Sequence, residues 1–228
     1  MTPKAYVRTL AAAFRKAGDP ERAGFQRAYM RDQYDYFGLG AKEWMAIVKA
    51  FHAEHGLFDG EDLKAYVRLC YGEERRELHY AAITMVEKQL KKQPADFIGF
   101  LEEMIVTNAW WDTVDWIAKL VGQHFQRYPD LQHPYCETWI DGPHLWLQRV
   151  AIIHQLAYKE KTDEKLLFNL ISRQADNKEF FIRKACGWAL RQYAKTRPAA
   201  VEKFLAKQPL SGLTVREARK QLDRMKGE

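Results

Sequence analysis

Apolar residues recur at helical spacing along almost the whole chain. Three stretches show the pattern most clearly: Ala5-Val7-Leu10-Phe14, Trp44-Ile47-Val48-Phe51 and Ala82-Ile83-Val86-Leu90. Spacings of three and four residues place such side chains on one face of an α-helix. The alternating apolar and polar positions that mark strands are missing. The sequence therefore predicts an all-α protein.

Proline, glycine and capping residues predict where these helices begin and end. We expect starts at Asp19-Pro20, Pro94, Thr162-Asp163 and Thr214, and ends at Gly18, Gly56 and Gly72. These signals predict about a dozen helices of roughly 10 to 20 residues, joined by short turns. The 13 Gly and 8 Pro are spread along the chain and form no run, so no flexible linker is predicted and one domain is expected over residues 1–228.

A short motif repeats along the second half of the chain. The segments Arg149-Val150-Ala151, Arg183-Lys184-Ala185 and Arg216-Glu217-Ala218 share the form Arg-x-Ala, and their alanines are 34 and 33 residues apart. Ala82 lies 69 residues before Ala151, roughly two such periods. This register resembles HEAT-like repeats, in which a small residue lets paired helices pack closely. Stacked repeats of this kind curve, and the second helix of each pair lines the concave side.

Charge changes the picture because it is unevenly distributed. The 228-residue chain carries 36 Lys and Arg against 30 Asp and Glu, a net charge of +6. Between Lys178 and Lys226, 13 basic residues stand against 4 acidic ones, an excess of +9 that leaves −3 for the rest. A polyanion would be drawn to this end. A solvated basic helix face without a ligand explains the charge equally well.

Several features point away from secreted, membrane or metal proteins. Cys70, Cys136 and Cys186 are far apart and form no CxxC pair, which favours a reducing compartment. The apolar stretch Leu10–Phe14 is too short for a signal peptide, and nothing approaches the roughly 20 apolar residues of a membrane span. The segment His52-Ala53-Glu54-His55 supplies too few ligands for a metal ion. We expect a cytoplasmic protein with no metal, no cofactor and no membrane contact.

The most unusual segment is Trp110-Trp111-Asp112-Thr113-Val114-Asp115-Trp116. On a helix, Trp111 and Asp115 share a face, which places a carboxylate next to an aromatic wall. In the structural alternative, the other two tryptophans are core residues and an aspartate caps the helix. Arg149 lies 34 residues after Asp115, so neighbouring repeats bring the two together, either in a functional site or as an ordinary ion pair.

A second group of residues is predicted on a helix from Glu179 to Lys195. One stripe of this helix contains Lys184, Trp188, Arg191 and Lys195. A tryptophan flanked by cations can stack on a base or sugar while the cations hold phosphates. A core tryptophan with cations extending to solvent fits the spacing equally well. Gly187 weakens the helix and suggests close approach of another backbone or a ligand.

A series of segments, in order along the chain, carries a resemblance to a known family. They are Phe100-Leu101-Glu102-Glu103-Met104-Ile105-Val106-Thr107, Trp110–Asp115, Trp146-Leu147-Gln148-Arg149, Lys178-Glu179-Phe180-Phe181-Ile182, Gly187-Trp188 and Arg191–Thr196. Together they resemble the AlkD family of DNA alkylation-repair glycosylases, and the resemblance covers nearly the whole chain. It implies a superhelical solenoid of HEAT-like helix-pair repeats with a concave basic DNA-binding face.

The resemblance also implies roles for individual residues. Trp111, Asp115 and Trp188 match the family's catalytic cleft, Arg149 matches its nearby cation, and Tyr29 matches a DNA-contacting aromatic residue. The cations Lys184, Arg191 and Lys195 would then bind DNA. The chain departs from the family after Phe37-Gly38-Leu39, where it reads Gly40-Ala41-Lys42 in place of polar residues that contact the DNA backbone. This departure puts that contact in doubt.

The implied activity is that of a monomeric enzyme acting on double-stranded DNA in base excision repair. It would hydrolyse the N-glycosidic bond of positively charged N3- and N7-alkylated purines such as 3-methyladenine and 7-methylguanine. A cationic base leaves as a neutral molecule, so one carboxylate suffices, and the sequence offers no convincing second one. Trp111 and Trp188 would attract the cationic nucleotide, while Asp115 stabilises the sugar cation and orients water.

Two other functions remain open. One is a non-catalytic HEAT-like protein that recognises damaged or branched DNA, and the other is a protein-binding repeat scaffold. The set Trp111, Asp115 and Trp188 favours the enzyme over the non-catalytic DNA-binding protein, whereas a protein-binding scaffold would show no salt-dependent affinity for DNA.

Overall fold

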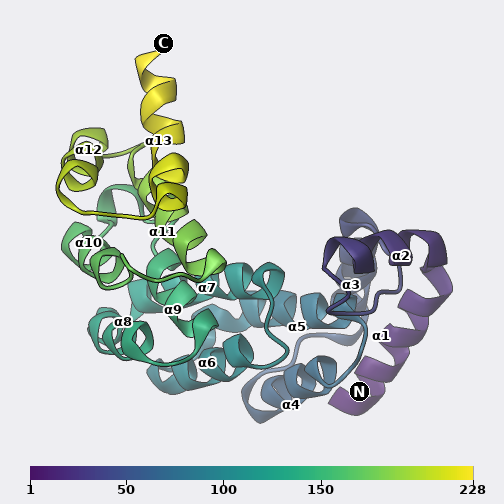
Figure 1. Ribbon diagram of the computed structural model, residues 1–228. Coiled ribbons are helices and arrows are strands. Elements are labelled where there is room, and N and C mark those ends of the chain that lie inside the picture. The colour runs from purple at the N-terminus through teal and green to yellow at the C-terminus, as the bar shows by residue number, and fades with distance from the viewer. Residues whose placement is uncertain (228) are drawn as a thin grey trace. The chain divides into compact units, whose positions relative to one another are not determined.

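A computed structural model describes residues 1–227, and within that range the chain folds into 13 α-helices joined by turns and short 3-10 segments (Figure 1). The helices are α1 Pro3–Ala17, α2 Pro20–Tyr29, α3 Ala41–His55, α4 Gly60–Tyr71, α5 Arg76–Gln89, α6 Ile98–Val106, α7 Trp111–Arg127, α8 Gln132–Asp141, α9 Leu145–Ile153, α10 Glu164–Arg173, α11 Phe180–Tyr193, α12 Pro198–Lys207 and α13 Gly212–Lys226. The all-α prediction is confirmed.

Most predicted helix ends are confirmed. Asp19 caps α2 by accepting hydrogen bonds from two backbone amides, Asp163 caps α10, and Gly18, Gly56 and Gly72 follow the last residues of α1, α3 and α4.

Two predicted starts are displaced. Pro94 precedes a 3-10 turn at Ala95–Phe97, and α6 begins only after it. The start of α13 is capped by Ser211, whose Oγ accepts from the Thr214 amide. The Thr214 hydroxyl donates instead to the Arg183 carbonyl of α11, 3.1 Å away, so this residue serves a tertiary contact.

The chain divides into two compact units, Met1–Pro94 and Ala95–Glu228. In the first unit, α1 packs on α3 and α4, and α4 packs on α5. Its core centres on Tyr6, whose ring makes edge-on contacts with Phe51, Phe58 and Tyr66 at centroid distances of 5.3 to 5.6 Å.

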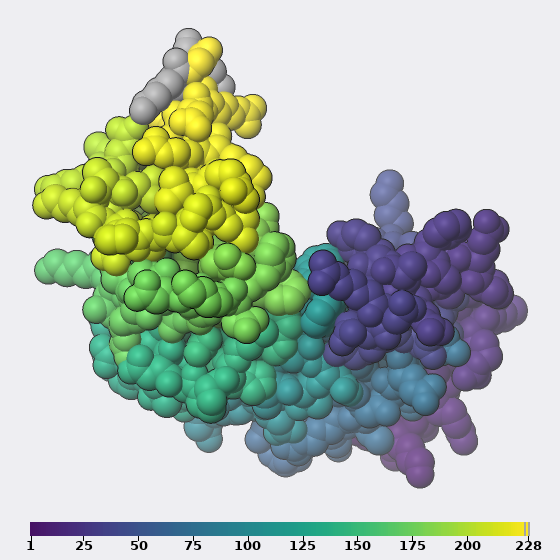
Figure 2. Space-filling model, viewed as in Figure 1, coloured from purple at the N-terminus to yellow at the C-terminus, as the bar shows by residue number. Residues whose placement is uncertain are grey.

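The second unit is built on a row of packed helices. In this row α9 lies against both α7 and α11, and α11 packs extensively on α13 (Figure 1). The repeated alanines Ala151, Ala185 and Ala218 lie on α9, α11 and α13, and all three are fully buried. The helix pairing expected from the repeat is therefore observed. Figure 2 shows the side chains of α10–α13, coloured green to yellow, filling the space that the ribbon leaves between them.

Gly187 marks the closest approach between two of these helices. A Cβ atom at this position would lie 2.5 Å from the Glu217 Cβ and 2.8 Å from the Thr214 carbonyl oxygen. Real side chains do not approach this closely, so α11 needs a glycine where α13 crosses it. The close approach of another backbone, predicted from the sequence, is confirmed.

Three further observations bear on the predicted class of protein. Within residues 1–227, no helix combines the length and the apolar character that crossing a bilayer requires. The same part of the chain contains no group of three or more His, Cys, Asp or Glu arranged to hold a metal ion. All three cysteines are free thiols buried in the core.

Candidate active site

Asp115 and Arg149 form a bidentate ion pair between α7 and α9. Arg149 donates from Nε to Asp115 Oδ1 at 2.7 Å and from Nη2 to Oδ2 at 2.8 Å. The proximity predicted from the 34-residue spacing is thus confirmed. Only 6% of the Arg149 side chain and 19% of the Asp115 side chain are exposed. Solvent therefore reaches the pair mainly from the aspartate side.

Arg149 also ties this pair to α11. Its Nη1 donates to the Phe181 carbonyl at 2.7 Å, and its guanidinium carbon lies 5.9 Å from the centre of the Phe181 ring. The Arg149 side chain therefore has donors engaged on two neighbouring helices at once. A guanidinium fixed by three hydrogen bonds in a planar fork has little freedom left. Asp115 is consequently held in one orientation.

Burial and charge act in opposite directions on Asp115. Burial raises the pKa of its carboxyl group above the ordinary value, and the nearby Asp112 adds to the rise. The hydrogen bonds and the charge of Arg149 oppose this shift. Burial outweighs them, so the pKa of Asp115 is raised. A carboxylate offers about four acceptor directions, and Arg149 occupies only two, so each oxygen can still accept a bond from water or substrate.

Three aromatic side chains pack together, and one of them, Phe181, lies next to the Arg149 guanidinium. The Trp110 ring meets those of Trp146 and Phe181 edge-on at 5.8 and 5.3 Å, and the Trp146 and Phe181 centroids are 4.9 Å apart. Trp110 is therefore a packing residue, as the structural alternative for this segment proposed. No aspartate caps α7: the helix begins at Trp111 without a side-chain cap, and Asp112 lies in its first turn.

The two predicted cleft tryptophans lie on α7, which carries Asp115, and on α11, whose Phe181 carbonyl accepts from Arg149. Trp111 is the first residue of α7, one turn before Asp115. Trp188 lies on α11, two turns beyond Phe181, whose carbonyl Arg149 binds. Both tryptophans are half-buried, so each packs on the protein and leaves part of its ring accessible. Trp188 can therefore offer only part of its ring to a base or sugar.

The cations flanking Trp188 have a partner that the sequence did not reveal. The carboxylate of Glu217, on α13, forms ion pairs with three cations: Lys184 Nζ at 3.0 Å, Arg191 Nη1 at 2.7 Å and Lys220 Nζ at 2.7 Å. Only 7% of the Glu217 side chain is exposed. Burial raises its pKa, but hydrogen bonds from Lys220 and Lys184 outweigh burial and lower the pKa to about 2. Three cations around one carboxylate leave a local net charge of +2.

The remaining predicted contacts lie elsewhere. The predicted helix end at Lys195 is wrong: α11 ends at Tyr193, and Lys195 is exposed in the turn that follows, so it does not continue the helix stripe of Lys184, Trp188 and Arg191. In the first unit, Tyr29 ends α2 with 74% of its surface exposed. Gly40 is the N-cap of α3, with its amide bound to the Glu43 carboxylate at 2.7 Å, and Lys42 is exposed in the first turn.

Sequence reasoning missed two groups that shape the site. The Phe181 carbonyl is a backbone acceptor and leaves no mark in a residue pattern. Glu217 was visible only as one acid in a basic segment, although its place beside the repeated Ala218 could have shown that it faces α11.

Comparisons with known proteins agree with this architecture. The family model described as DNA alkylation repair enzyme matches residues 10–222. A solved structure from Enterococcus faecalis, described as a predicted DNA alkylation repair enzyme, has 32% sequence identity and a TM-score of 0.85, covering 90% of this chain and 96% of its own.

Two more distant structures share the fold. AlkD2 from Streptococcus mutans has 19% identity and a TM-score of 0.61, covering 80% of this chain and 90% of its own. The protein smu.31 from Streptococcus mutans UA159 has 17% identity and a TM-score of 0.59, covering 78% and 95%. No curated protein matches the chain significantly. Because the family model spans nearly the entire sequence, the chain belongs to the AlkD-like family of DNA alkylation repair enzymes.

Proposed function

We propose that the chain is a DNA glycosylase that hydrolyses the N-glycosidic bond of N3- and N7-alkylated purines, including 3-methyladenine and 7-methylguanine. The observation that carries this proposal is the Asp115 carboxylate, oriented by Arg149 and largely desolvated, one turn from Trp111 in a protein of the DNA alkylation repair family. The chemistry requires a fixed negative charge where a positive charge develops on the sugar.

The proposed mechanism uses the charge that the lesion brings. Alkylation at N3 or N7 makes the purine cationic, so the bond to the sugar breaks with the electron pair leaving on a neutral base. The sugar becomes an oxocarbenium-like cation, which the Asp115 carboxylate stabilises electrostatically. Water then adds to the sugar carbon and loses a proton. The acceptor directions that Arg149 leaves unoccupied on Asp115 are available to orient that water.

The two tryptophans would select the charged substrate. An aromatic face attracts a cation by roughly 0.5 to 2 kcal/mol, depending on how dry the site is. Trp111 lies on α7, the helix that carries Asp115, and Trp188 lies on α11, whose Phe181 carbonyl binds Arg149. An unmodified purine carries no charge and gains little from such contacts. Recognition and bond weakening would therefore depend on the same positive charge.

The substrate would be duplex DNA bound by a monomer. We propose that the paired helices form a HEAT-like superhelix over residues 1–228, with a basic concave surface. Lys184, Arg191 and Lys195 of the second unit and Tyr29 of the first would then contact the DNA backbone. The net charge of +2 around Glu217 supports this, because that carboxylate orients its cations without cancelling their charge.

The test is the release of 7-methylguanine from methylated duplex DNA by the Asp115→Asn variant. The amide keeps the shape of the side chain and loses the negative charge, so we expect release to fall by at least about a hundredfold. Asp141→Asn is the matched control, because Asp141 forms an Asp–Arg pair with Arg173 on the surface of the same unit. Equal rates for wild type and Asp115→Asn, with Asp141→Asn also unchanged, would refute the proposal.

A second candidate is a DNA-binding protein without turnover. It is favoured by one observation: both Asp115 oxygens are engaged by Arg149, as in a purely structural ion pair. In that case wild type binds alkylated duplex DNA in a salt-dependent manner but frees no base, as mass spectrometry of the supernatant would show.

A further inference from the structure

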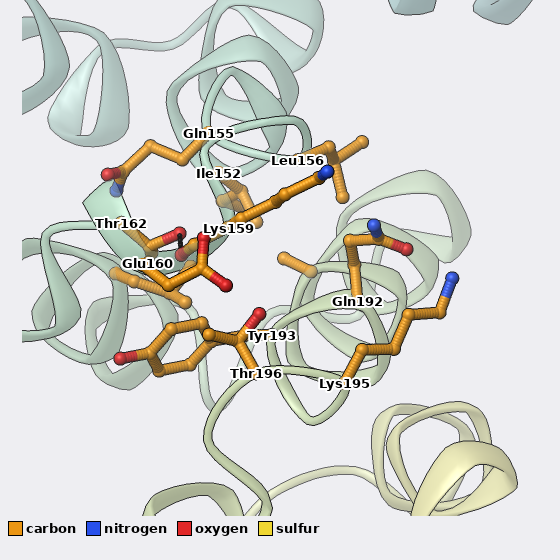
Figure 3. A pocket seen from close by; sticks show the side chains of 12 residues that line it. Ile152, Gln155, Leu156, Lys159, Glu160, Thr162, Gln192, Tyr193, Lys195 and Thr196 are labelled. Carbon is orange, nitrogen blue, oxygen red and sulfur yellow. Dashed lines mark hydrogen bonds between the residues drawn. The ribbon is translucent and has the colours of Figure 1, made fainter.

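A cavity of about 230 Å³ opens where α9 and α11 end (Figure 3). Its apolar wall consists of Ile152, Leu156, Leu167 and Ala189. Pockets for drug-sized ligands span about 300 to 1,000 Å³, so this one has room for a single ring system. An apolar wall of this size suits one flat heterocycle.

The rim of the cavity is polar, and several of its groups are already engaged. The Gln155 side chain bonds to the Asp163 backbone, the Thr162 hydroxyl donates to the Lys159 carbonyl, and the Tyr193 hydroxyl donates to Glu164.

The remaining rim groups are available to a ligand. Within residues 1–227, the side chains of Lys159, Lys195, Gln192 and Glu160 have no hydrogen-bond partner in the protein. In Figure 3 the Gln192 amide lies between the amino groups of Lys159 and Lys195, while the Glu160 carboxylate lies on the other side. One side of the cavity thus offers donors for an anion, and the other offers an acceptor.

Lys159 is held over the cavity by an unusual backbone. Its φ of 53° lies in the left-handed region, which a residue with a side chain adopts at an energetic cost. The residue before it is anchored, because the Tyr158 hydroxyl donates to the Gly122 carbonyl of α7 at 2.6 Å. The Thr162 amide and hydroxyl both bond to the Lys159 carbonyl. Strain of this kind often occurs at binding sites.

The cavity adjoins the candidate active site along two helices. On α11, Gln192 lies one turn beyond Trp188, about 6 Å along the axis. On the α9 side, Ile152 lies about one turn beyond Arg149. Along one strand of duplex DNA, successive phosphates are about 3.4 Å apart along the helix axis, so about 6 Å spans roughly two nucleotides. A DNA strand that passes Trp188 would therefore bring a nearby nucleotide to the cavity.

We propose that this cavity is a subsite for a single nucleotide unit, with a base against the apolar wall and a phosphate between Lys159 and Lys195. The Glu160 carboxylate would accept from N–H groups on the edge of the base, as guanine presents. Such a unit comes either from a DNA strand at the active site or from a free nucleotide. The strand source rests on the proposed function, whereas the free nucleotide does not.

The experiment compares three probes by calorimetric titration: 2′-deoxyguanosine 5′-monophosphate, deoxyguanosine and inorganic phosphate. The nucleotide should bind at least about tenfold more tightly than either fragment, because only it uses both the apolar wall and the lysines. Lys159→Ala should weaken nucleotide binding about tenfold. Lys165→Ala, an exposed lysine of α10 outside the cavity, is the matched control. Thr196→Phe, which places a ring in the cavity, should abolish nucleotide binding.

Two results would overturn the subsite. One is a nucleotide affinity no higher than that for phosphate, and the other is an unchanged affinity in Lys159→Ala and Thr196→Phe. Binding of a single-stranded trinucleotide at least as tight as that of the mononucleotide supports the strand source, and tighter binding of the mononucleotide supports the free one. Asp115→Asn should retain nucleotide binding, so failure of the subsite and failure of the glycosylase are scored independently.

Discussion

Replacing Arg149 by Gln tests how strongly the ion pair couples two helices. The substitution leaves the Asp115 carboxylate with a buried face and no charged partner, and it removes the bond to the Phe181 carbonyl. Breaking a fully buried pair costs about 3 to 5 kcal/mol. Because 19% of the Asp115 side chain is exposed, water compensates in part, and we expect a loss of about 2 to 3 kcal/mol in the free energy of unfolding.

The assay is urea unfolding of wild type, Arg149→Gln, Asp115→Asn and the double variant. Removing both charges should cost less than the sum of the two single changes, because the lone buried charge is what destabilises each single variant. Arg173→Gln is the control, since its pair with Asp141 is largely exposed and should contribute less than about 1 kcal/mol. Additive single changes, or a loss in Arg149→Gln no larger than in Arg173→Gln, would refute the reasoning.

The same variant predicts a change in pH dependence. Burial raises the pKa of Asp115, and Arg149 opposes that rise, so removing Arg149 should raise the pKa further. The proposed mechanism needs the ionised carboxylate. The acid limb of the base-release profile should therefore move to higher pH in Arg149→Gln, while an unmoved limb would show that another group sets it.

Three further predictions concern the α11–α13 contact and the basic residues around it. Gly187→Ala should destabilise the fold by about 1 to 3 kcal/mol in urea unfolding because its Cβ would meet α13, whereas Gly24→Ala, with nothing within 4 Å, should be neutral or stabilising. The pKa of Glu217 is lowered to about 2 in the folded protein, against about 4.3 in the unfolded chain. Its contribution to the free energy of unfolding is therefore complete above about pH 4.3 and is lost as the pH falls toward 2. Glu217→Gln should abolish this pH-dependent loss of stability in acid unfolding, which amounts to roughly 1 to 2 kcal/mol after allowing for solvent around the lysine partners of Glu217. Lys195→Ala should lower the salt dependence of DNA binding by about one counterion, and Lys184→Ala by less, because Glu217 already shares its charge.

Part of the site could be predicted because, in a repeat protein, residues one repeat apart in sequence lie on neighbouring helices. Asp115 and Arg149 meet because neighbouring helices of the row are about one period apart. Gly187 indicated the close approach of another backbone or a ligand, and the structure shows that the neighbour is α13. Glu217 was not predicted as the partner of the Trp188 stripe, because its segment is basic overall; its place beside the repeated Ala218 was the one feature that pointed toward α11. Backbone groups, such as the Phe181 carbonyl, are invisible to residue patterns.

Two carboxylates of the second unit, Glu217 and the partly buried Asp115, show why one is a candidate for chemistry and the other is not. Glu217 accepts from three cations, of which Lys220 and Lys184 lower its pKa to about 2, so it has little capacity to respond to a new positive charge. Asp115 has one cation, and burial still raises its pKa, so its negative charge is incompletely compensated. A sugar cation forming beside Asp115 would supply the missing compensation. The environment that destabilises this carboxylate in the resting protein is the one that would favour the transition state.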